Sequence, residues 1–166
     1  MAHPLVEQLR FARAEFQRGL EGVTEEDGSI RLLPSNSIGW TVAHMATQER
    51  AFWVIWPQGI TDVAPELDAW QGPTTPPLSG AWVAWRAVTE ASDRWLDSLT
   101  EGGMAEHLIV NGKPYRESVG TMLLRAIYHY WHHIGEAGAI RQQLGHADLP
   151  QFVGNLGTEA PYRPGA

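Results

Sequence analysis

The chain has 166 residues, of which 43% are apolar and 19% charged, so it has enough apolar sequence for one folded domain with a hydrophobic core. Its formal net charge is −7 and its only lysine is Lys113, which excludes the basic surface that a nucleic-acid backbone requires. Because the chain has no cysteine, it cannot form disulfides, thiolate metal sites or a cysteine nucleophile.

No stretch approaches the roughly 18 consecutive apolar residues of a membrane helix, and the N-terminus is amphipathic, unlike a signal peptide. We therefore expect a soluble, cytoplasmic protein. Four segments have the apolar periodicity of amphipathic helices. These segments span residues 5–20, 38–56, 79–99 and 118–144.

The ends of these helices have recognisable signals. Pro57 is expected to stop the second helix, Ser79 to cap the third, and Gly145 to follow the last helical turn of the fourth. The tryptophans of the third helix form a stripe that is more typical of a core than of a ligand cage. Gly135 and Gly138 lower the helix propensity of the fourth helix, which predicts the close approach of a neighbouring helix, either within the chain or across a dimer interface.

The connections differ in character. Residues 57–77 are rich in proline, glycine and aspartate and predict a long irregular crossover, whereas Asn111-Gly112 predicts a tight turn or small hairpin. Residues 146–166 form a tail rich in proline and glycine, expected as a surface strap or a partly disordered end. The whole pattern predicts an all-α protein, with residues 1–145 forming a four-helix bundle.

A pair of histidines in the fourth helix is the strongest chemical signal. His129 and His133 are four residues apart, so both imidazoles lie on one helix face and can reach the same metal ion. His132 is three residues from His129 and is an alternative second ligand, although the helical wheel favours His133. Packing or solubility alone can also explain paired histidines.

Catalytic metal sites of the zinc type commonly use three protein ligands and keep one open position. His44 is the candidate for the third ligand, because the apolar residues around it should turn it inward. Alone it would be a core histidine, but together with the downstream pair it is expected to bind the metal. Histidine ligands suit zinc, nickel and iron alike.

Other residues are candidates for the surroundings of this site. Arg125 and Glu136 share the face of the histidine pair and could orient a ligand or contact a substrate, or could form an ordinary solvated pair. Trp40, Tyr128 and Trp131 flank the predicted ligands and could line a pocket. Aromatic side chains at these positions are also typical of a bundle core.

The segments Gly39-Trp40-Thr41-Val42-Ala43-His44 and His129 to Glu136 together resemble the DinB-like superfamily. The resemblance covers roughly residues 5–145. It implies a four-helix bundle in which His44, His129 and His133 hold a divalent metal. It also implies a low-molecular-weight thiol, such as mycothiol, bacillithiol or glutathione, used in transferase or isomerase reactions.

The chain departs from that family at two positions. Where relatives often have His-His-Arg-Gly-Gln, this sequence has Ile134 in place of the arginine and Glu136 in place of the glutamine, which puts the substrate in doubt and not the metal. We expect a thiol and an electrophile as substrates, and a homodimer. Three alternatives stay open: a metal-binding stress or ligand-binding protein without turnover, a metal-dependent hydrolase, and a purely structural histidine cluster.

Overall fold

The computed structural model describes residues 2–163, which fold into helices and one small two-stranded ribbon. The elements are α1 (Pro4–Gly19), α2 (Glu25–Ser29), α3 (Ile38–Glu49), η1 (Arg50–Ile55), α4 (Trp56–Gln58), η2 (Pro65–Trp70), α5 (Leu78–Asp97), α6 (Glu101–Met104), β1 (Ile109–Val110), β2 (Lys113–Pro114), α7 (Val119–Gln143) and α8 (Leu156–Glu159). The predicted all-α class is confirmed. None of the described helices is long and apolar enough to cross a membrane.

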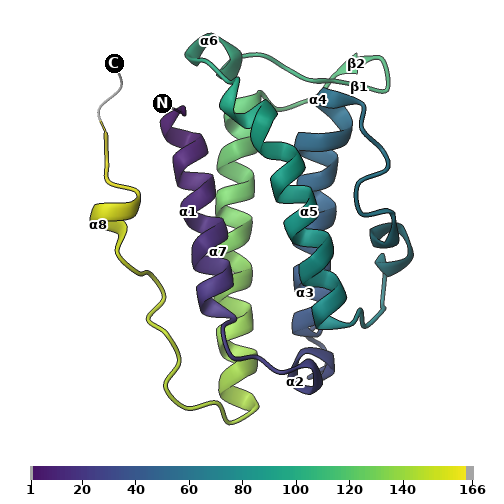
Figure 1. The fold of residues 1–166 in the computed structure, drawn as a ribbon, viewed down its shortest axis with the longest axis vertical. Helices are drawn as coiled ribbons and strands as arrows, with labels where there is room; N and C mark the ends of the chain where they lie inside the picture. Colours follow the sequence, from purple (N-terminus) through teal and green to yellow (C-terminus); the bar gives the residue numbers. More distant parts are fainter. Residues whose placement is uncertain (1, 164–166) are drawn as a thin grey trace. The chain divides into compact units, whose positions relative to one another are not determined.

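The chain divides into two compact units, each built on one pair of long helices. The first unit contains α1, α6, α7 and the C-terminal tail, and α1 and α7 lie side by side and point the same way (Figure 1). Between them, Phe16 packs edge-on against Tyr130 with ring centroids 5.3 Å apart. Near the C-terminal ends of both helices, the Arg141 guanidinium donates a hydrogen bond to the Gly19 carbonyl.

The second unit contains α2, α3, η1, α4, η2, α5 and the ribbon. Its long helices α3 and α5 are also parallel, as Figure 1 shows. Trp53 of η1, which directly follows α3, stacks on Trp95 near the C-terminal end of α5 with ring centroids 5.6 Å apart. Because both helices point the same way, the chain between them must return along the whole pair, which gives the predicted crossover its topological reason.

A buried arginine fixes this crossover. Arg50 is only 6% exposed. It donates hydrogen bonds to the Asp68 carboxylate at 2.7 Å and to the Thr61 carbonyl at 2.8 Å. The first of these contacts is also an ion pair, so the crossover is attached to the helix that precedes it.

Two predicted helix ends are wrong. Pro57 does not stop the second helix, which continues through Gln58 and ends at Gly59 with a φ of 70°. Proline is tolerated there because α4 is a separate short helix and Pro57 lies in its first turn. A first helical turn does not need the backbone N–H that proline lacks. Ser79 does not cap α5, which starts one residue earlier, and its N–H instead donates to the Glu25 carboxylate at 2.9 Å.

The tail runs along α1 in the opposite direction. Arg18 donates to the Gln151 carbonyl at 2.6 Å, and the Glu15 carboxylate accepts from the Gly154 N–H at 2.7 Å. Further along, Gln8 donates to the Ala160 carbonyl at 2.9 Å. The tail therefore lies as a strap on α1 up to residue 163, and residues 164–166 are outside the described part of the chain.

Replacing Glu15 with glutamine should destabilise the protein at neutral pH but not in acid. Hydrogen bonds from the Arg18 side chain lower the pKa of Glu15, and the backbone N–H of Gly154 adds to this effect. A lowered pKa stabilises the fold above the carboxyl's ordinary pKa, and this contribution is lost as pH falls through the lowered value. Urea unfolding of both proteins between pH 7 and pH 3 measures the difference.

The matched control is Glu21→Gln, since Glu21 is exposed. We expect that variant to unfold like the unaltered protein across the pH range. If Glu15→Gln also unfolds like the unaltered protein at pH 7, the carboxylate does not hold the tail.

Candidate metal centre

The histidine pair lies in the middle of α7, the longest helix of the chain. The Ser118 hydroxyl caps this helix by accepting a hydrogen bond from the Thr121 N–H. His129 and His133 occupy one face, as their spacing predicts, with ring centroids 4.6 Å apart. Their Nε2 atoms point at each other and are 2.9 Å apart.

This geometry suits the binding of one metal ion. Zinc–nitrogen bonds are about 2.0–2.1 Å long. For nitrogen–zinc–nitrogen angles between about 90° and 110°, two imidazole nitrogens on one ion therefore lie about 2.9–3.4 Å apart. The observed separation is at the short end of this range. The pair therefore needs little movement to become two ligands.

A carboxylate holds the other nitrogen of His133. The Glu136 Oε2 atom lies 2.7 Å from the His133 Nδ1 atom. A carboxylate accepts the Nδ1–H, which leaves the Nε2 lone pair for a metal and fixes the orientation of the ring. His133 is only 6% exposed, whereas the Glu136 side chain is partly exposed.

His132 occupies a different environment. It is exposed, and its ring meets His133 edge-on with centroids 4.9 Å apart. Ligand atoms of His132, His133 and Glu136 lie within 4.8 Å of one another, so this trio is a second possible metal cluster. Its drawback is that metal binding there competes with the contact between Glu136 and His133 Nδ1.

His44 lies on α3, in the other unit. Its ring is half-buried and stacks on Trp40 with centroids 4.6 Å apart and only 10° between the planes. Trp40 is itself held, because its Nε1–H donates to the Gly72 carbonyl of the crossover at 2.8 Å. In this stack the lone pairs of the imidazole nitrogens lie in a plane parallel to the indole, so neither nitrogen points into the tryptophan face.

The remaining predicted site residues differ in their surroundings. The Arg125 guanidinium pairs with the Glu117 carboxylate, with a distance of 2.7 Å from Nε to Oε2. Tyr128 is 65% exposed. Trp131 packs against Phe11 of α1 with ring centroids 6.1 Å apart, on a side of α7 about 160° from the histidine pair. Trp40 is the predicted pocket aromatic that contacts a predicted ligand.

Comparison with known proteins identifies the family and the fold. The family model of mycothiol-S-transferase matches residues 4–146, a range that includes all three predicted ligands. A solved DinB-like protein from Bacillus subtilis is similar over 92% of this chain and 99% of that chain, with 18% sequence identity and a TM-score of 0.63.

At that identity the structural likeness shows the fold alone, and the predicted DinB-like fold is thereby confirmed. No curated protein matches the sequence. Because the family model covers most of the sequence, the chain belongs to the mycothiol-S-transferase family.

Proposed function

We propose that the protein is a metal-dependent thiol S-transferase in which His44, His129 and His133 hold a divalent ion. The observation that carries this proposal is the convergence of two Nε2 atoms at 2.9 Å, with the second nitrogen of His133 tied to a carboxylate. Membership of the mycothiol-S-transferase family supports mycothiol as the thiol. Bacillithiol and glutathione are the alternatives to be tested beside it.

His44 is our candidate for the third ligand. It lies within the matched family range, and its stacking on Trp40 restricts its ring to few orientations, which lowers the entropy lost on binding. The resemblance of this segment to the DinB-like pattern supports the same assignment. A three-histidine set is compatible with zinc, nickel or iron.

The reaction follows from the chemistry of thiols. When bound, a divalent cation lowers the pKa of a thiol from about 8.5, so that the nucleophilic thiolate is present at neutral pH. The thiol sulfur forms a bond to an electrophilic carbon, the bond to the leaving group breaks, and the leaving group departs with the electron pair. The role of Glu136 is to keep the proton on His133 Nδ1 and the ring in place.

The test is turnover with defined thiols. Zinc-, nickel- or iron-loaded protein is given mycothiol, bacillithiol or glutathione with monobromobimane, and adduct formation is followed by fluorescence. We expect the metal-loaded protein to consume mycothiol faster than the reaction in buffer does. It should also consume mycothiol faster than the His133→Ala variant does. If none of the three thiols is bound or consumed, the proposal is wrong. Binding without consumption would identify a thiol-binding protein instead of an enzyme.

Replacing Glu136 with glutamine should weaken metal binding by about 10- to 100-fold, which is the usual effect of losing a carboxylate behind a histidine ligand. The amide keeps the size of the side chain but loses the charge that favours the required tautomer. Competition with a chromophoric chelator measures the affinity. Glu117→Gln is the control, because its carboxylate pairs with Arg125. Equal affinities for the two variants would contradict the role given to Glu136.

A further inference from the structure

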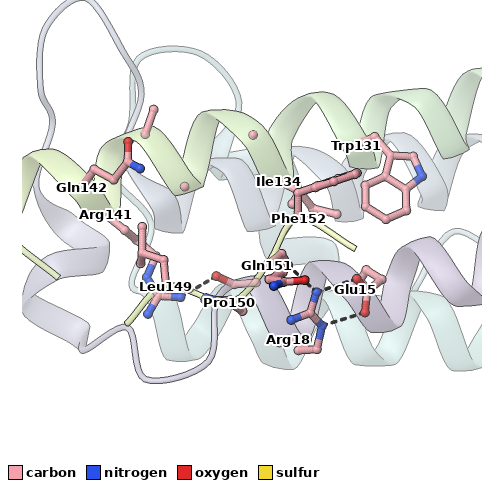
Figure 2. Close-up of a pocket in the computed structure, with 14 residues that line it drawn as sticks. Glu15, Arg18, Trp131, Ile134, Arg141, Gln142, Leu149, Pro150, Gln151 and Phe152 are labelled. Atoms are coloured by element: carbon pink, nitrogen blue, oxygen red, sulfur yellow. Dashed lines mark hydrogen bonds and ion pairs between the residues drawn. The ribbon is translucent and has the colours of Figure 1, made fainter. Parts of the chain in front are cut away.

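A pocket of about 520 Å³ lies in the first unit between α1, α7 and the tail. This volume is within the range of small-molecule sites, which is about 300–1,000 Å³. Figure 2 shows Trp131 at one end, Arg141 and Gln142 at the other, and Ile134 and Phe152 between them. The tail adds Leu149 and Pro150, so most of the lining is apolar.

This pocket is separate from the histidine pair. Its α7 side is a stripe that includes Trp131 and Gly138, at a spacing of seven residues. At 100° per residue, these two positions lie about 140° to 180° around the helix axis from His129 and His133. A ligand in the pocket would therefore lie on the side of α7 away from His129 and His133.

Two glycines keep the floor of the pocket open. A Cβ atom added at Gly135 or Gly138 would meet no atom within 4 Å, so no helix within the described chain closely approaches these two positions. Each glycine lowers helix stability by roughly 1 kcal/mol relative to alanine. Open space beside the bare backbone is the feature that the two glycines provide.

The charge of the lining is unbalanced. Glu15 and Arg18 neutralise each other through two hydrogen bonds of 2.7 Å. Arg141 is 6% exposed and donates to the Gly19 carbonyl and to His146 Nδ1, neither of which is a carboxylate. Within residues 2–163 the structure gives Arg141 no carboxylate partner. A buried guanidinium without a counter-charge is costly, so the pocket favours an anion.

We propose that this pocket is a binding site for a small organic anion with a flat apolar body. The carboxylate or sulfonate of such a ligand would meet the Arg141 end, where a guanidinium can donate two parallel hydrogen bonds. The body would lie on the glycine floor, between Trp131 and Phe152. Phe152 is 78% exposed in the described structure, so a ligand would cover an aromatic side chain that now faces solvent.

Two fluorescent probes that differ only in the acid group test the proposal. Anilinonaphthalene sulfonate has the anionic group, and phenylnaphthylamine is the same ring system without it. We expect the unaltered, metal-loaded protein to bind the sulfonate with a stoichiometry of one and at least about tenfold more tightly than the neutral probe, the difference that one charge-assisted hydrogen bond supplies. Arg141→Gln should reduce the affinity for the sulfonate to that for the neutral probe.

A second variant covers the case in which Arg141→Gln fails to fold. Gly138→Leu fills the pocket from an open position and should abolish binding of both probes, whereas Gly157→Leu, at an open position outside the pocket, should leave binding unchanged. Binding of the sulfonate to Gly138→Leu as tight as to the unaltered protein would place the probe elsewhere and overturn the proposal. Equal affinities for the two probes would overturn the role of Arg141.

Because metal removal should not change probe binding, the outcome of this probe experiment is independent of the proposed transferase activity.

Discussion

Replacing His133 with alanine is expected to abolish stoichiometric metal binding. The substitution removes the buried Nε2 ligand and also leaves the Glu136 carboxylate without its imidazole partner. Loss of a direct ligand should cost more than the roughly 100-fold upper limit for loss of an outer carboxylate. Metal content per chain after dialysis, and titration with zinc, nickel and iron, measure the effect.

His132→Ala is the matched control, because it removes the neighbouring imidazole from an exposed position. We expect this variant to keep its metal. The opposite pattern, in which His132→Ala loses the ion and His133→Ala keeps it, would contradict the pairing of His129 with His133. Loss of metal in both variants would favour the cluster of His132, His133 and Glu136.

Replacing Gly39 with alanine is expected to destabilise the second unit by about 2–3 kcal/mol, within the usual cost of overpacking a core. An added Cβ would lie 2.5 Å from the Pro76 carbonyl oxygen and 3.1 Å from the Gly28 carbonyl oxygen. Both obstacles are backbone atoms, so relief requires α3 to move away from Pro76, which lies just before α5, and from Gly28 of α2. Urea unfolding measures the change in free energy.

Gly135→Ala is the control for this substitution, because an added Cβ there meets no atom within 4 Å. The control should be neutral or gain up to about 1 kcal/mol from helix propensity. Equal stability of Gly39→Ala and Gly135→Ala would show that the contact with Pro76 does not restrict residue 39.

The apolar periodicity of the sequence predicted the four long helices, because each buries one continuous stripe. The same reasoning missed α2, which has five residues and too little periodicity to detect. Its signal was the reciprocal cap between Thr24 and Asp27, which is local chemistry. Pro57 was misjudged because its effect depends on where a helical turn begins, which periodicity does not specify.

At the candidate site, too, the features of a single helix could be predicted from the sequence and the packing between segments could not. The spacing of His129 and His133 is a property of one helix, so the sequence predicted their shared face and the structure confirms it. The surroundings of Trp131 depend on how α1 and the tail pack against α7, and residue spacing does not encode that packing. The pocket beside Arg141 was missed for this reason, since half of its apolar wall comes from a tail without periodicity.

The central claim is a metal centre that needs His44 as well as the pair on α7. Plasma mass spectrometry of tag-free protein and of the His44→Ala variant tests it most directly. We predict about one divalent ion per chain, as in three-ligand sites with one open position, and its loss in the variant. The claim would be contradicted by an unchanged metal content in His44→Ala, or by no metal in the unaltered protein after reconstitution with zinc, nickel or iron.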